Sequence, residues 1–389
     1  MRRQAPTEGD TLLRQSGRTR RRDTLCALPF QRPWLPPIEQ IQQYFVLSRA
    51  EHWYSNFGPC NDLLAERVSG LLEDRPIVAV SSAGIGLIAA LRTLVPSDSP
   101  ARQVILPSFT FAATAAAVVW CGLEPVFCDV EPEGWHLGPE HLQEALRARP
   151  GKVAAVLSCS AFGTPPSLEI SSAWSRLAEE WDVPLVVDAA SGFGASEWER
   201  PPDAEVFSMH ATKPLAVGEG GLVAFADESW AASARTLVNH GVDADQDAVV
   251  VGLNGKLDEW HSATALAALD TLDERVAARR AAAARLRVRL REYDVDFQQR
   301  ADRSPTQFVP ALLPSGRRRD EVLSRASSLG VELRTYFDPS LHESTAYRGC
   351  DRSGELRVTT DLAGRMLSLP MADDITLADE DLILECFRT

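Results

Sequence analysis

The sequence predicts an α/β protein with a large domain on a mainly parallel sheet and a smaller α+β domain at its C-terminal end. Three observations lead to this prediction. Between about residues 76 and 225, short β-rich runs alternate with helical stretches, as in a parallel sheet covered on both faces. Several of these runs are apolar without alternation, which is typical of strands buried on both sides. Near residue 262 the pattern changes to one long helical run.

Seven strands are expected in the large domain, which we predict to span residues 29–261. They cover residues 76–80, 103–107, 125–130, 152–160, 184–189, 204–209 and 220–225. Helices are expected between them at 138–149 and at 171–182, and Ser171 is a suitable N-cap for the second. This order of elements is that of a sheet with helices on both faces.

The smaller domain is predicted to span 262–389 together with the helix that links the two domains. No glycine or proline interrupts residues 262–293, and this Ala-, Leu- and Arg-rich run suits one long helix. An apolar run at 307–314 follows, then a polar helix at 317–328 that stops at Gly330. The last helix is expected to begin after Thr376, a plausible N-cap.

Composition limits the partners and the compartment. The net charge of −14 argues against a generic nucleic-acid or anionic-membrane surface, and no apolar run approaches the roughly 20 residues that span a bilayer. Seven scattered cysteines without a CxxC pair form neither a disulfide framework nor a metal-binding pattern. Residues 1–28 are polar and basic and lack the apolar core of a secretory signal, so we expect a disordered tail and a cytoplasmic protein.

Lysine is rare in this chain, which takes its positive charge almost wholly from arginine. The three lysines are Lys152, Lys213 and Lys256. Because arginine suffices for charge pairing and solubility, a retained lysine indicates an amine that must lose its proton or act as a nucleophile. Lys213 stands between an apolar run and a cluster of glycines. A loop lysine without a special role fits this observation equally well.

Asp188 ends the strand expected at 184–189 and precedes a turn of small residues at 190–194. In open α/β sheets, ligands bind beyond the carboxyl ends of the strands, so Asp188 and Lys213 could share one cleft. Such a pair fits pyridoxal phosphate (PLP), which needs a lysine for a Schiff base and a carboxylate to keep its ring nitrogen protonated. Residues 81–84, before a helix, and the hydroxyl of Ser208 are candidates for binding the phosphate.

From about residue 29 to the C-terminus, the sequence resembles the DegT-type sugar aminotransferases, which are PLP enzymes of fold type I. The matching segments lie in the family's order along the chain. They are NFGP at 56–59, VILPSFTFAATAAAVVWCGLEPVFCDVEPE at 104–133, PLVVDAASGFG at 184–194, DAEVFSMHATKPLAVGEGG at 203–221, GLNGKLDEWHSA at 252–263, VELRTYFDPSLHESTAY at 331–347 and LSLPM at 367–371.

The resemblance implies a role for several residues of the PLP site. Lys213 falls on the Schiff-base lysine and Asp188 on the carboxylate that pairs with the pyridine nitrogen. Ser208 falls on a serine that binds the phosphate. Phe111 falls on an aromatic residue that stacks on the cofactor, although a core phenylalanine would fit its sequence context too.

The resemblance also implies partners and substrate contacts. Asn239 matches an asparagine that reaches the phosphate in the neighbouring subunit's site, which implies a homodimer with shared active sites. Tyr336 and His342 lie in a loop that borders the substrate in the family, but an aromatic packed between domains and a surface histidine are equally good interpretations. Lys256 lies in a matching segment and is expected to be a structural or interface cation, whereas Lys152 is expected to be solvated.

The function that the resemblance implies is transfer of an amino group from glutamate or glutamine to a keto sugar, commonly nucleotide-linked, or to a keto-cyclitol of an antibiotic pathway. The donor would displace Lys213 from the cofactor, and the freed amine would then move a proton between the substrate and cofactor carbons. The acceptor half would repeat these steps in reverse.

The chain departs from the family's pattern at two places. Ser191 stands where the family usually has His or Gln close to the ring hydroxyl of the cofactor, and Ser82-Ala83-Gly84 stands in place of Asn-Gly-Thr. Backbone N–H groups at Ala83 and Gly84 are expected to hold the phosphate instead. The departures leave room for a PLP enzyme of another type, such as an eliminase or decarboxylase. A non-catalytic ligand-binding relative is a third reading, which the retention of Lys213 disfavours.

Overall fold

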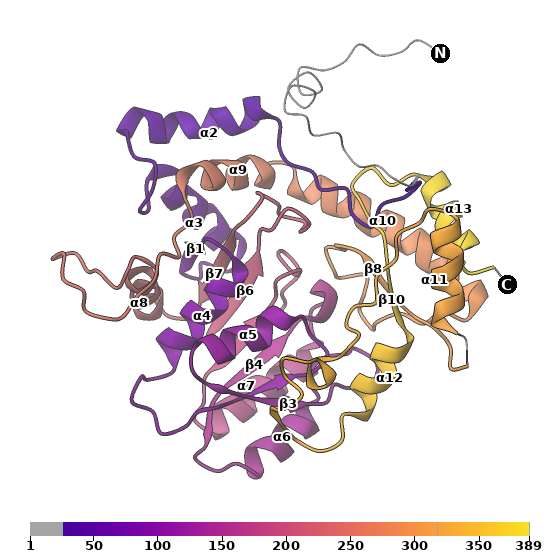
Figure 1. The fold of residues 1–389 in the computed structure, drawn as a ribbon. Coiled ribbons are helices and arrows are strands. Elements are labelled where there is room, and N and C mark those ends of the chain that lie inside the picture. The colour runs from indigo at the N-terminus through magenta and orange to yellow at the C-terminus, as the bar shows by residue number, and fades with distance from the viewer. Residues whose placement is uncertain (1–25, 317, 389) are drawn as a thin grey trace.

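The computed structural model describes residues 26–316 and 318–388. Its large sheet has eight strands in the order β1-β7-β6-β5-β4-β2-β3-β9, of which Figure 1 labels β1, β7, β6, β4 and β3. β7 is antiparallel to both β1 and β6, and the other neighbouring strands are parallel. The first seven strands occupy the seven predicted runs, so the mainly parallel sheet is confirmed. The strands are β1 Ile77–Val80, β2 Gln103–Pro107, β3 Glu124–Cys128, β4 Val153–Cys159, β5 Leu185–Asp188, β6 Ala204–Ser208, β7 Gly221–Phe225 and β9 Asp351–Arg352.

Both faces of the sheet are covered by helices. In β2, Ile105 joins one apolar cluster while Val104 and Leu106 join another, because successive side chains of a strand point to opposite faces. This explains why the strands are apolar throughout. Helices α2 Ile38–Glu51, α3 Pro59–Leu71, α6 Pro139–Arg147, α7 Leu168–Glu180 and α9 Glu259–Leu269 pack in the first cluster, and α4 Ala83–Leu94, α5 Ala112–Trp120 and α8 Glu228–Val238 pack in the second.

The prediction that Ser171 caps the helix after β4 is wrong by one turn. α7 begins at Leu168, and its N-cap is Ser167, whose Oγ accepts a hydrogen bond from the N–H of Ile170 at 3.2 Å. Ser171 lies inside the helix, where it is buried. Both serines suit a cap by residue type, and the structure uses Ser167, the earlier of the two.

The single long helix predicted at 262–293 is also wrong, because the structure has two helices there. α9 ends at Leu269 and α10 runs from Leu272 to Leu290. At the break, the carboxylate of Asp270 accepts hydrogen bonds from the hydroxyl of Tyr44 at 2.9 Å and from Arg67 Nη2 at 3.0 Å. Asp and Thr favour helix ends over helix interiors, so the Asp270–Thr271 pair is a suitable place for the interruption.

The C-terminal part contains a second, two-stranded sheet, in which β8 Val309–Leu312 is antiparallel to β10 Met366–Leu369. α10, α11 Arg319–Ser328 and α13 Leu377–Glu385 pack with it around a third apolar cluster. Thr376 caps α13 as predicted, and its Oγ1 accepts from the N–H of Asp379 at 3.2 Å. α12 Arg357–Arg365 precedes β10, and β9 from this part joins the edge of the large sheet beside β3. The predicted domain division at 261/262 stays a prediction.

The prediction that the disordered tail includes residue 28 is wrong. Leu28 is buried in the third apolar cluster. Its N–H donates to the carbonyl oxygen of Gly330 at 3.1 Å, and its own carbonyl accepts from the N–H of Glu332 at 3.0 Å. Residues 1–25 lie outside the described part of the chain. Within residues 26–316 and 318–388, no helix combines the length and the apolar character needed to cross a membrane.

Candidate active site

A cavity of about 380 Å³ lies at the carboxyl ends of β4, β5 and β6. Each of these strands ends in a residue that lines the cavity, namely Cys159, Asp188 and Ser208. Lys213 lines it from the segment after β6. This is the edge of a parallel sheet at which ligands bind, so the prediction that Asp188 and Lys213 meet in one cleft is confirmed by the geometry.

The Lys213 amine is held by two neutral side chains. Its Nζ donates to Ser191 Oγ at 2.7 Å and to Gln307 Oε1 at 3.0 Å. Burial lowers the pKa of Lys213 to about 8, while the charge of Asp188 acts in the opposite direction. An amine with this pKa is partly unprotonated near neutral pH, and it can therefore act as a nucleophile or accept a proton.

Asp188 is a buried carboxylate without a direct ion-pair partner among the described residues. It is 5% exposed, and its Oδ2 accepts from Thr114 Oγ1 at 2.7 Å while its Oδ1 accepts from the N–H of Ala190 at 3.1 Å. Burial raises its pKa, and these two hydrogen bonds and the charge of Lys213 oppose that rise. A cationic ligand atom placed against a buried carboxylate of this kind would stabilise its charged form.

The N-terminus of α4 faces the cavity with unpaired backbone donors. Ser82 is the N-cap, and its Oγ accepts from the N–H of Ile85 at 3.2 Å. The N–H groups of Ala83 and Gly84, in the first turn, have no intrahelical acceptor, and both residues line the cavity. The backbone at Gly221 lies close to the start of α4, since a Cβ on Gly221 would lie 2.7 Å from the nitrogen of Ala83. Together with Ser208, the helix start fits an anion such as a phosphate.

Aromatic side chains form much of the remaining wall. Phe111, the residue before α5, lines the cavity and is 58% exposed, so its ring is available to a flat ligand. Tyr336 also lines the cavity and packs against Phe308 with ring centroids 5.6 Å apart, and its contact with substrate stays a prediction. The cavity thus combines an apolar wall with a lysine, a carboxylate and an anion site.

Two predicted site residues lie outside this cavity. Asn239 is the C-cap of α8, and its N–H donates to the carbonyl oxygen of Arg235 at 3.2 Å. The predicted contact of Asn239 with the neighbouring subunit's site stays a prediction. His342 lies beside the first residue after β2, with its Nδ1 2.7 Å from Ser108 Oγ. Its contact with substrate stays a prediction.

Gln307 is one of the site residues that the sequence did not reveal, as are Thr114 and Phe308. Gln307 precedes β8, is 5% exposed, and accepts hydrogen bonds from both Lys213 and Ser191. No motif surrounds it, and its contact with Lys213 spans 94 residues of chain. Only the folded structure brings it to the lysine.

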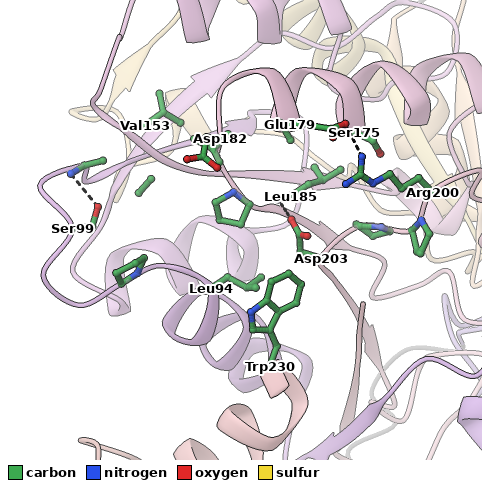
Figure 2. Close-up of a pocket in the computed structure, with 18 residues that line it drawn as sticks. Leu94, Ser99, Val153, Ser175, Glu179, Asp182, Leu185, Arg200, Asp203 and Trp230 are labelled. Carbon is green, nitrogen blue, oxygen red and sulfur yellow. Dashed lines mark hydrogen bonds and ion pairs between the residues drawn. The ribbon is translucent and has the colours of Figure 1, made fainter. Parts of the chain in front are cut away.

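A second cavity, of about 590 Å³, lies at the opposite edge of the sheet, where β4, β5 and β6 begin (Figure 2). Figure 2 shows Arg200 paired with Glu179 and the carboxylate of Asp203 accepting from the N–H of Leu185, at 2.6 and 2.8 Å. Lysine is absent among the described residues that line it. The charged groups of Arg200, Glu179 and Asp203 already have partners there, so the cavity at the carboxyl ends, which holds Lys213 and Asp188, is the candidate active site.

Comparisons with known proteins show the family of this chain. The DegT/DnrJ/EryC1/StrS aminotransferase family matches residues 38–388. Protein Rv3402c of Mycobacterium tuberculosis is 32% identical over 366 residues, which cover 92% of this chain and 88% of that protein. The dTDP-4-amino-4,6-dideoxy-D-glucose transaminase of Shigella dysenteriae is 25% identical over 365 residues, which cover 92% of this chain and 97% of that protein.

Solved structures with the same fold include an aminotransferase of the same family. A DegT DnrJ EryC1 StrS aminotransferase from Brucella abortus has a TM-score of 0.80 and 27% identity, and the match covers 90% of this chain and 95% of that chain. DesI, solved in the presence of its TDP-sugar product, has a TM-score of 0.81 and 32% identity over 92% of this chain and 91% of that one. The predicted fold class and enzyme class are confirmed. This chain belongs to the DegT/DnrJ/EryC1/StrS aminotransferase family.

Proposed function

We propose that this protein is a PLP-dependent aminotransferase that moves an amino group from glutamate or glutamine to a keto sugar linked to a nucleotide, or to a keto-cyclitol. The observation that carries the proposal is the meeting of the Lys213 amine and the Asp188 carboxylate in one cavity beside a helix N-terminus. The named relatives support the sugar class, since one is a dTDP-sugar transaminase and DesI has a TDP-sugar product.

The residues present fit the cofactor. The Asp188 carboxylate would pair with the ring nitrogen, and the N–H groups of Ala83 and Gly84 with the Ser208 hydroxyl would hold the phosphate. Phe111 would cover one face of the ring. Lys213 Nζ would hold the aldehyde carbon covalently. When bound, PLP supplies an electron sink for the substrate carbon that loses its proton.

The protein's own contribution to the reaction is proton transfer and charge placement. Lys213, once released from the cofactor by the donor, would take the proton from the carbon that bears the amino group and return a proton on the acceptor side. Asp188 would stay ionised against the cationic ring nitrogen, which compensates the cost of burying the carboxylate. The aromatic wall of Phe308 and Tyr336 would help to exclude water.

The pKa of Lys213 gives a prediction about how the cofactor binds. Because the amine must be unprotonated to attack the aldehyde, the rate at which cofactor-free protein captures PLP should rise through a midpoint near the lysine's pKa of about 8 and level off above it. Stopped-flow absorbance across a pH series measures this rate. A midpoint near 10, that of an ordinary exposed lysine, would contradict the described environment of Lys213.

The reaction class is tested by following nitrogen. The amino donors carry ¹⁵N and are glutamate, glutamine labelled at the amide and glutamine labelled at the amino group. Protein loaded with PLP is incubated with each donor, together with a panel of nucleotide-linked keto sugars and keto-cyclitols. Mass spectrometry should find ¹⁵N in an amino sugar or aminocyclitol. Loss of carbon dioxide or of a leaving group, with no nitrogen transferred, would indicate decarboxylation or elimination. The absence of any Lys213-dependent change would favour a non-catalytic ligand-binding relative.

We infer a homodimer with shared active sites. Asn239, expected at a phosphate, lies outside its own chain's cavity. The segment between α8 and α9 exposes Val249, Val250 and Val251, and a run of exposed apolar side chains favours a protein interface. The mass of the purified protein in solution, from light scattering, should be twice that of the chain. A monomer that is fully active would overturn this inference.

A further inference from the structure

Gln307 is a buried glutamine from the C-terminal part of the chain whose amide reaches the site lysine. Its Oε1 accepts hydrogen bonds from Lys213 Nζ at 3.0 Å and from Ser191 Oγ at 2.7 Å. Its Nε2 donates to Thr212 Oγ1 at 3.1 Å. Because both ends of the amide have partners, the oxygen is directed at the lysine and the nitrogen away from it.

The backbone before Gln307 is shaped to place this side chain. Thr306 has a φ of 60°, in the left-handed region, which costs a residue other than glycine about 1 kcal/mol or more. The N–H of Thr306 donates to Ser304 Oγ at 3.1 Å, and that hydroxyl donates to the carbonyl oxygen of Phe162 at 3.1 Å. The turn is therefore fastened to the loop after β4, which also borders the cavity.

We propose that Gln307 is a positioning residue of the active site, where with Ser191 it holds the Lys213 amine and contacts the polar edge of the bound cofactor beside it. This inference rests on the proposed function. Ser191 is short where the family resemblance leads one to expect His or Gln beside the ring hydroxyl. Gln307 supplies the missing amide from the segment before β8, and Ser191 is hydrogen-bonded to it.

A neutral amide suits this position better than a carboxylate would. Asp188 at the end of β5 is the titratable group whose charge already favours the Lys213 ammonium, whereas burial raises the pKa of the Cys159 thiol at the end of β4 and keeps it neutral. His210, on the same segment as Lys213, is bonded to Thr212 and lies 3.7 Å from Glu219. A further negative charge within about 4 Å would raise the pKa of the amine by about 1 to 3 units. Gln307 orients the amine without adding that charge.

The test uses the full-length protein freed of cofactor and a set of matched variants. Gln307→Glu adds the charge with almost no change in shape, and Gln307→Leu removes the hydrogen bonds. Gln298→Leu is the control, because Gln298 is 3% exposed and lies in the same stretch of chain. Its Nε2 donates to the carbonyl oxygens of Gly134 and Ala161, neither of which lines the cavity. The double variant Gln307→Leu/Ser191→Gln places an amide where the family resemblance expects one.

The readouts are the pH dependence of PLP capture at Lys213, trapped with borohydride and mapped by mass spectrometry, and the cofactor dissociation constant. We expect Gln307→Glu to move the midpoint of capture upward by about 1 to 3 pH units. We expect Gln307→Leu to weaken cofactor binding about fivefold to tenfold, the effect of losing its one proposed hydrogen bond to the cofactor. Ser191→Gln should restore binding in the Leu background. Gln298→Leu should leave both readouts unchanged.

Two results would overturn the inference. One is an unchanged midpoint in Gln307→Glu, and the other is a Gln307→Leu variant whose cofactor affinity equals that of Gln298→Leu. If the wild-type protein captures PLP at Lys213 normally, either of these results leaves the proposed function intact. Failure of the wild-type protein to capture PLP at Lys213 would remove the proposed function itself, so the two failures are distinguishable.

Discussion

The Lys213→Ala variant should lose amino transfer almost completely, with turnover reduced by about 10⁴-fold or more. The side chain is expected to serve twice, as the covalent anchor of the cofactor and as the group that moves the proton. Alanine supplies neither. The other residues near the amine, Ser191 and Gln307, are neutral hydrogen-bonding groups that cannot replace it as a base. Single-turnover kinetics with labelled donor and excess PLP measure the loss.

Lys152→Ala is the matched control for this variant. Lys152 is exposed and precedes β4, at the edge of the sheet opposite the candidate active site. It should retain wild-type turnover. A loss of only about tenfold in Lys213→Ala is what removal of a minor contact would cause. Such a result would show that the assignment of Lys213 as the catalytic lysine is wrong.

The largest expected effect on stability comes from Arg75→Met. Arg75 and Glu205 form a buried ion pair with Nη1 and Oε2 2.9 Å apart. Nη2 also donates to the carbonyl oxygens of Ala224 and Pro202 at 2.7 and 3.0 Å. Burial raises the pKa of Glu205, and the charge of Arg75 opposes that rise. Without the guanidinium the carboxylate stays buried and unpaired, so the free energy of unfolding should fall by about 3–5 kcal/mol.

Urea denaturation of Arg75→Met beside Arg200→Met measures the difference. Arg200 pairs with Glu179 at 2.6 Å, but both side chains are 65% exposed, so its replacement should cost at most about 1 kcal/mol. Adding Glu205→Gln to Arg75→Met should recover part of the loss, because the buried charge is then removed. Equal losses in the two single arginine variants would show that the buried pair does not stabilise the fold as argued.

The sequence revealed those parts of the fold that depend on local pattern. Strands buried on both faces are apolar throughout, so β1 to β7 could be located from short runs alone. Asp188 and Lys213 could be paired before the structure was known, because Asp188 ends one strand, Lys213 follows the next, and the carboxyl ends of both strands lie at the same edge of the sheet. Thr376 could be identified as a cap from the residues around it.

The parts that the sequence did not reveal depend on contacts between distant segments. The break between α9 and α10 lies at Asp270, which is held by Tyr44 and Arg67 from the N-terminal helices. No glycine or proline marks that break. Gln307 reaches Lys213 only because the turn at Thr306 is fastened to the loop after β4, and no local pattern encodes such a contact.

The central claim is that Lys213 binds PLP and releases it to an amino donor. The most direct measurement is the absorbance spectrum of the purified protein mixed with PLP, before and after addition of glutamate or glutamine, with Lys213→Ala beside it. The account predicts a visible band that forms with the cofactor, bleaches when the donor is added and is absent in the variant. A wild-type protein that forms no band with PLP would contradict it.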